Sequence, residues 1–163
     1  MKKMVWICFI CLLFPGAGFA SEGLKIGTKA PNFFAHSSNG KIFRLYRAGT
    51  MPKIVNFWWV SCAPCRKEMP ELASLEKQHP KIKFLVVHTV SSDNNKIPSF
   101  LKDIRSVPSN ILMGSEALLE LYKFKTLPHT AVLDGANIVR LVVSGYTKEN
   151  VKKLKKIITK LDK

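Results

Sequence analysis

The chain has 163 residues, a length that fits one domain, and 47% of them are hydrophobic, which is enough for a sizeable core. The formal net charge is +15, but the basic residues are spread along the chain and no helix-turn-helix, zinc-finger or RRM-type pattern accompanies them. These features argue against a nucleic-acid-binding protein. We interpret the charge as a lysine-rich solvated surface, with peripheral contact to an anionic membrane or an acidic partner as the secondary interpretation.

The first twenty residues have the layout of a secretory signal. Two lysines precede an apolar run, and small residues at Gly18 and Ala20 mark a cleavage site. We expect residues 1–20 to be a signal peptide and residues 21–163 to form the exported mature domain. The alternative is an uncleaved membrane anchor, because the apolar stretch is about as long as the shortest span that crosses a bilayer core.

After the leader, two short extended runs flank a turn rich in Ser, Asn and Gly, which predicts a β-hairpin. An unbroken β-branched and aromatic run over 53–59 predicts a central strand covered on both faces. Further along, periodicity and turn signals predict four helices and four more strands. In chain order the predicted elements are hairpin strands over 32–35 and 41–45, the strand over 53–59, a helix over 62–79, a strand over 82–90, a weaker helix over 96–105, a strand over 111–113, a short helix capped by Ser115 and ending near Tyr122, strands over 130–133 and 138–143, and a closing helix capped by Thr147.

This order predicts an α/β fold. A buried strand–helix–strand unit followed by an antiparallel hairpin and a closing helix implies a mixed central sheet with helices on both faces. In the helix over 62–79, Met69, Leu72 and Leu75 share an inward face, and Pro70 predicts a kink.

The chain has four cysteines, of which Cys8 and Cys11 lie in the leader. A four-thiolate zinc site is rejected, because zinc ribbons bring their two pairs much closer in sequence than Cys62 and Cys65 lie to the first pair. A cytochrome-type haem attachment site is also rejected, because it needs His directly after the second cysteine and this chain has Arg66 there. The mature chain therefore has one pair of cysteines, which suits one reversible disulfide.

The position of this pair predicts redox chemistry. Cys62 is expected at the N-cap of a helix, where free N–H groups and the helix dipole lower the pKa of a thiol below its usual ~8.5. Cys65 lies one turn further in and is more shielded. We therefore predict that Cys62 attacks a partner disulfide and that Cys65 resolves the mixed disulfide.

The segment Val55–Trp58 followed by Cys62–Pro70 closely resembles the active-site segment of TlpA-like and ResA-like thiol-disulfide oxidoreductases, a thioredoxin-fold family of exported bacterial proteins. The resemblance covers most of the mature chain and includes Lys29–Phe33, Leu127–Thr130, Asp134–Gly135 and the terminal helix. It implies a thioredoxin-like fold with an N-terminal β-hairpin extension, and a cis-proline at Pro128 beside the cysteines. The substrate-binding residues that we predict are Trp58, Ala63, Pro64, Leu127 and Pro128.

The resemblance also assigns a proton-handling group. Asn56 stands where thioredoxin carries a buried carboxylate, and Glu68 matches the glutamate that the family places near the cysteines. Glu68 would then be the third catalytic residue, assisting deprotonation of Cys65; the alternative is an ordinary exposed helix glutamate. Trp59 replaces a smaller residue of the family and fits either the core or the border of the substrate groove.

The leading functional hypothesis is a monomeric periplasmic enzyme that reduces disulfides of exported proteins without a cofactor or metal. The Ala63-Pro64 dipeptide between the cysteines lacks the histidine of strongly oxidising relatives such as DsbA, which favours a reducing role. The resemblance suggests apocytochrome c or copper-site thiols as substrates and a DsbD-like membrane thiol transporter as electron donor. The alternative is a copper-binding protein that uses both cysteines and His129, although a packed or surface histidine is the plainer interpretation of that residue.

Overall fold

The computed structural model describes residues 22–163. The predicted signal peptide over 1–20 and the expected first mature residue lie outside this range, so both remain predictions. Across residues 22–163, none of the helices combines the length and the apolar character that crossing a membrane requires.

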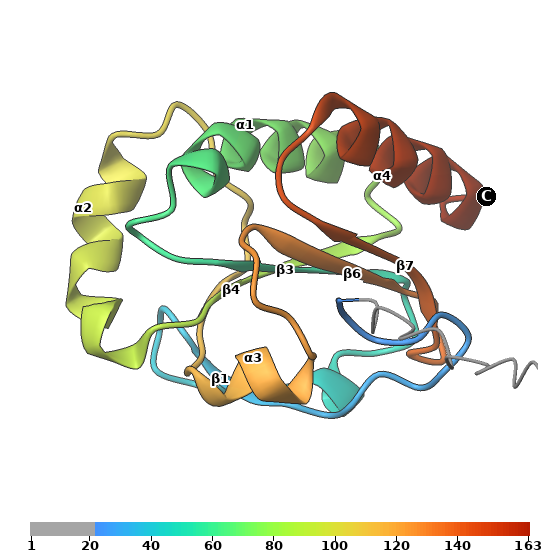
Figure 1. The fold of residues 1–163 in the computed structure, drawn as a ribbon, viewed down its shortest axis with the longest axis horizontal. Helices are drawn as coiled ribbons and strands as arrows, with labels where there is room; N and C mark the ends of the chain where they lie inside the picture. The colour runs from blue at the N-terminus through green and yellow to red at the C-terminus, as the bar shows by residue number, and fades with distance from the viewer. Residues whose placement is uncertain (1–21) are drawn as a thin grey trace, which may run out of the picture.

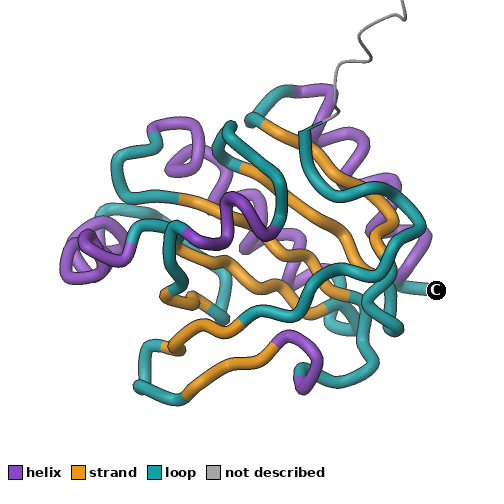
Figure 2. Tube along the Cα trace, turned by 60° about the horizontal axis from the view of Figure 1, so that its bottom comes forward, coloured by secondary structure: helices purple, strands orange, loops and turns teal. Residues whose placement is uncertain are grey.

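Seven strands form one mixed sheet, which Figure 2 shows with its strands side by side and the helices outside it. The strands are β1 (Phe34–Ser37), β2 (Ile42–Arg44), β3 (Lys53–Trp58), β4 (Lys83–His88), β5 (Ile111–Met113), β6 (His129–Leu133) and β7 (Val139–Ser144). Their spatial order is β2-β1-β5-β4-β3-β6-β7. β3 is parallel to β4 and antiparallel to β6, and the β1–β2 hairpin joins the sheet antiparallel to β5. The predicted central strand and N-terminal hairpin extension are confirmed.

Helices cover both faces of this sheet, as predicted. The α-helices are α1 (Ala63–Gln78), α2 (Ile97–Lys102), α3 (Ala117–Leu121) and α4 (Lys148–Leu161), with 3-10 turns η1 (Leu45–Arg47) and η2 (Ser91–Lys96). In Figure 1, α1 and α4 lie on one face and α3 lies on the other, while α2 lies near the start of α1. All six residues of β3 are buried, which explains why the strand shows no polar alternation.

The two faces of β3 contribute to separate parts of the core. Phe57 has no exposed surface and packs against Tyr122 and Phe124, each with its ring centroid 4.8 Å away. Ile54 and Trp58 point to the opposite face, where the buried residues of α1, α2 and α4 meet them. The predicted inward face of α1 is confirmed, because Met69, Leu72 and Leu75 are all buried, and Pro70 lies inside the helix.

Two helix predictions need correction. α3 begins at Ala117 after Glu116, and no side-chain hydrogen bond caps it, so Ser115 is not its cap. The Glu116 carboxylate instead accepts the Ser91 N–H at 3.0 Å, a long-range contact that local sequence does not reveal. The helix predicted over 96–105 is shorter, because Lys96 belongs to η2 and α2 ends at Lys102. The predicted cap of α4 is confirmed, since Thr147 Oγ1 accepts the Asn150 N–H at 3.1 Å.

We predict that Phe57→Ala lowers the free energy of unfolding by about 3–5 kcal/mol, because the substitution leaves a cavity among tightly packed aromatic rings. Urea denaturation followed by circular dichroism measures the change. Phe34→Ala is the matched control: its side chain is 55% exposed on β1, so we expect a loss below about 1 kcal/mol. Equal losses in the two variants would contradict the assignment of Phe57 to the core.

Candidate active site

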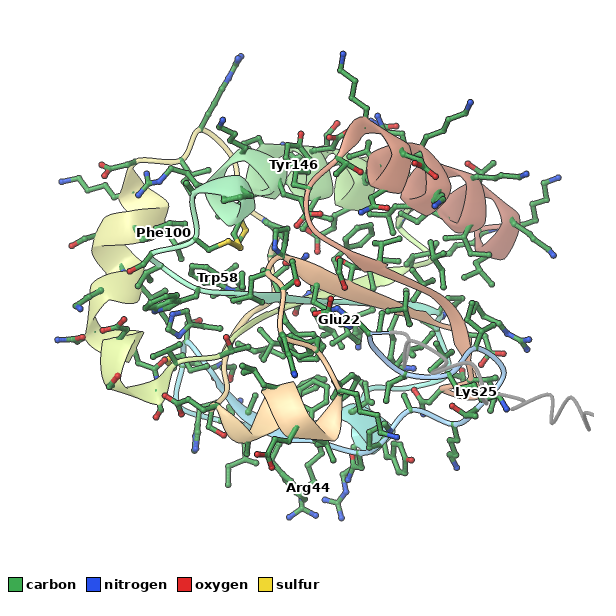
Figure 3. The ribbon with its side chains drawn as sticks, viewed as in Figure 1. Glu22, Lys25, Arg44, Trp58, Phe100 and Tyr146 are labelled. Atoms are coloured by element: carbon green, nitrogen blue, oxygen red, sulfur yellow. A yellow bond between two sulfur atoms is a disulfide. The ribbon has the colours of Figure 1, made fainter. Side chains whose placement is uncertain are left out.

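The two cysteines lie at the N-terminus of α1, directly after the strand and loop that lead out of the sheet. Cys62 is the N-cap residue, and its sulfur accepts the Cys65 N–H at 3.2 Å. Pro64 occupies the first turn, where a missing N–H costs no helical hydrogen bond. The two sulfurs form a disulfide, so the structure shows the oxidised protein (Figure 3).

The exposure of the two cysteines differs. Cys62 is partly exposed, whereas Cys65 is 1% exposed and packs with Trp58 and Met69. An incoming sulfur can therefore reach Cys62 more easily than Cys65. This asymmetry agrees with the roles that the sequence predicts for the pair.

The loop before Cys62 is held by His88, the last residue of β4, and by Asp93 of η2. Val60 N–H donates to His88 Nε2 at 3.4 Å, and Trp59 Nε1 donates to Asp93 Oδ2 at 2.7 Å. Burial lowers the pKa of His88, which keeps the imidazole neutral and able to accept this hydrogen bond. Sequence reasoning missed His88 and Asp93. Parallel pairing of β3 with β4 sets Trp58 opposite His88 and is the signal that could have found the histidine.

The two tryptophans of this segment have different surroundings. Trp58 has no exposed surface and packs against Phe100 and His88, with ring centroids 4.9 Å away in both cases. It therefore supports the cysteine loop from the core and offers no surface to a substrate in this oxidised form. Trp59 is partly exposed, and its indole N–H donates a hydrogen bond to Asp93. Its position is therefore intermediate between the two considered for it, the core and the border of the substrate groove.

Pro128 follows a cis peptide bond from Leu127 and lies just before β6, at the end of the sheet where β3 finishes. Leu127 packs against the cluster that contains Cys65. Ala63 and Pro64 are exposed in the first turn of α1. The fold thus brings the predicted segments 62–65 and 127–128 to one region.

Glu68 lies one turn beyond Cys65 on the same helix face and is 6% exposed. Its Oε2 accepts the Asn56 side-chain N–H at 2.8 Å, and Asn56 also donates to Thr130 Oγ1 at 2.9 Å. Burial raises the pKa of Glu68 to about 7; the Asn56 hydrogen bond opposes this effect and the nearby Glu71 carboxylate adds to it. A carboxyl group that titrates near neutrality can both accept and release a proton.

His129 lies on the other side of the sheet. Its ring stacks on Phe124 with centroids 4.5 Å apart, and its Nδ1 is 2.8 Å from Ser144 Oγ. Burial lowers the pKa of His129 to about 4. Alternation along β6 turns Thr130 toward Asn56 and Glu68, and it turns His129 away from them. The packed-histidine interpretation is confirmed, and no three His, Cys, Asp or Glu residues within 22–163 are grouped to hold a metal ion.

A protein-family model described as the AhpC/TSA family matches residues 26–142 of the chain. Thiol-disulfide oxidoreductase ResA of Bacillus subtilis (strain 168) is 30% identical over 151 residues, which cover 91% of this chain and 84% of the relative. The sporulation thiol-disulfide oxidoreductase A of the same organism is 27% identical over 162 residues, with coverage of 93% and 96%.

Solved structures agree with these matches at the level of the fold. A Chlorobium tepidum structure that carries the name DsbE has a TM-score of 0.78 at 20% sequence identity, covering 86% of this chain and 99% of its own. StoA of Bacillus subtilis has a TM-score of 0.62 at 23% identity, with coverage of 80% and 97%. The cysteine pair at the start of α1, in a thioredoxin-like fold, thus agrees with the thiol-disulfide chemistry for which the relatives are named. The chain belongs to the AhpC/TSA family of thioredoxin-like proteins and is a thiol-disulfide oxidoreductase related to ResA.

Proposed function

We propose that the protein is a periplasmic reductase that breaks disulfides of exported proteins by cycling Cys62 and Cys65 between dithiol and disulfide. The observation that carries the proposal is the asymmetry of the pair. One sulfur is accessible at a helix N-cap, and the other is buried one turn from a carboxyl group with a pKa of about 7. Such a site can attack, resolve and handle a proton without a cofactor.

The reaction starts when the Cys62 thiolate attacks one sulfur of the substrate disulfide. The substrate S–S bond breaks, its other sulfur leaves with the electron pair, and Cys62 is joined to the substrate. The Glu68 carboxylate then takes the proton of the Cys65 thiol, and the new Cys65 thiolate attacks the Cys62 sulfur. The bond to the substrate breaks, its second thiolate is released and protonated, and the pair becomes the disulfide that the structure shows.

A substrate would approach the surface formed by Ala63 and Pro64 on one side and the partly exposed Leu127 on the other, where the buried Pro128 follows Leu127 through the cis peptide bond. Trp58 would act from beneath this surface by fixing the loop that carries Cys62. The resemblance to ResA-like and TlpA-like proteins supports apocytochrome c cysteines or copper-site thiols as substrates. Each turnover passes two electrons to the substrate, so a donor such as a DsbD-like membrane thiol transporter must reduce the pair again.

We predict a reduction potential for the Cys62–Cys65 pair nearer to the about −270 mV of thioredoxin than to the about −120 mV of DsbA. Equilibration in dithiothreitol buffers of defined redox ratio, followed by alkylation and mass spectrometry, measures it. A value close to that of DsbA would contradict the reductase and make the protein an oxidant.

In Cys65→Ala we expect substrates to accumulate as mixed disulfides on Cys62, because the resolving sulfur is gone. Non-reducing electrophoresis and mass spectrometry of a periplasmic extract would identify them. Cys62→Ala is the matched control and should trap nothing. Tight Cu(I) binding by the intact protein without reductase turnover would favour the copper-binding alternative instead.

We predict that the rate of mixed-disulfide resolution rises with pH through about 7, because the ionised Glu68 is the base. In Glu68→Gln this rise should disappear, and the rate at pH 7 should fall on the order of 100-fold. Any remaining rise should come from ionisation of the buried Cys65 thiol without the help of a base, at higher pH. Stopped-flow fluorescence across this pH range measures both variants.

Glu120→Gln supplies the control for this experiment, since Glu120 is an exposed glutamate of α3 on the opposite face of the sheet. Its pH profile should match that of the unmodified protein. An unchanged profile in Glu68→Gln would eliminate the proton-transfer role of Glu68.

A further inference from the structure

The turn between β7 and α4 is fixed against the cis-proline segment. Gly145 N–H donates to the Pro128 carbonyl at 2.7 Å, and the Asn150 side chain donates to the carbonyls of Ser144 at 2.8 Å and Gly145 at 2.9 Å. Gly145 has a φ of +79°, a conformation that favours glycine. The next residue, Tyr146, is therefore held at a defined position, and Figure 3 places it beside α1 near α4.

Tyr146 and α4 together bind a second carboxylate of α1. The Tyr146 hydroxyl donates to Glu71 Oε2 at 3.0 Å, and Lys155 Nζ lies 2.7 Å from Glu71 Oε1. Both carboxylate oxygens thus have a partner, and the two partners come from the turn and from α4. The Glu71 side chain is 24% exposed and the Lys155 side chain 54%, so the cluster lies at the protein surface.

Glu71 follows Glu68 by three positions and shares its helix face. Cys65 of the same helix is in the disulfide and does not titrate in this oxidised form, so the other titratable group that faces Glu68 is Tyr146 of the turn. The strands beneath contribute the neutral Asn56 and Thr130. Within the described chain, Glu71 is therefore the charged group best placed to influence the proton on Glu68.

We propose that Glu71, held by Tyr146 and neutralised in part by Lys155, is a positioning residue that sets how readily Glu68 releases and takes up its proton. The inference rests on the proton-transfer role proposed for Glu68. It extends that role, because the charge of Lys155 on α4 would act through Glu71 on the ionisation of the buried Glu68.

Coulomb's law gives opposite signs for two substitutions in this cluster. The negative charge of Glu71 disfavours an ionised Glu68, and it contributes to the raised pKa of Glu68. Glu71→Gln removes this repulsion, so Glu68 should ionise at lower pH. Lys155→Met removes the cation that offsets Glu71, so Glu68 should ionise at higher pH. For partly solvated charges, we expect each displacement to be roughly half to one pH unit.

The test is a carbon-13 NMR titration of the Glu68 carboxyl in the oxidised full-length domain, because this readout does not depend on turnover. We expect the titration midpoint to move down in Glu71→Gln and up in Lys155→Met. Lys153→Met is the matched control, since Lys153 is on the same helix but pairs with Glu149 at 2.7 Å. Midpoints that stay unchanged, or that move in the same direction in both variants, would overturn the inference.

The pH profile of mixed-disulfide resolution separates this inference from the function on which it rests. Profiles that move together with the NMR midpoints support both. Midpoints that move while the rate profile stays fixed support the influence of Glu71 and contradict the catalytic role of Glu68. Lys155 is about half exposed, so Lys155→Met keeps the test available if Glu71→Gln does not fold.

Discussion

The first turn of α1 is the constraint on which the rest of the site depends. A helix begins with N–H groups that have no helical partner, and here the sulfur of Cys62 accepts one of them, from Cys65. A thiolate accepts such a bond more strongly than a thiol does, and the helix dipole acts in the same direction. The contact that starts the helix therefore also favours the reactive form of the cysteine, so fold and chemistry share one interaction.

This start of the helix fixes what lies one turn deeper. Cys65 and Glu68 face the core, and a buried carboxyl group needs a hydrogen-bond donor or must remain protonated. Asn56 supplies the donor and also bonds Thr130, so one amide joins β3, α1 and β6. A second carboxylate in place of Asn56 would repel Glu68. The amide therefore suits a site whose proton-handling group lies on the helix.

The sheet divides the molecule into a redox layer, which holds the two cysteines and Glu68, and an aromatic layer, which holds Phe57, Tyr122 and Phe124. Along β6, Thr130 faces the redox layer, whereas His129 packs on Phe124 in the aromatic layer. Adjacent residues of a strand point to opposite faces, so proximity in sequence to Pro128 does not bring the His129 side chain to the cysteines. A copper set built from both cysteines and this histidine would need them on one face.

Local pattern by itself determined the order of strands and helices, the central strand, the Thr147 cap and the position of Cys62 at a helix start, because periodicity and capping act over a few residues. Resemblance to a known family added the predictions of a cis-proline at Pro128 and of a catalytic role for Glu68. Only the tertiary structure decided that Glu68 is buried, that His88 holds the loop before the cysteines and that the Ser115 cap is absent. Those outcomes depend on burial and on contacts between distant segments, which strand pairing and helix packing create and which no local pattern encodes.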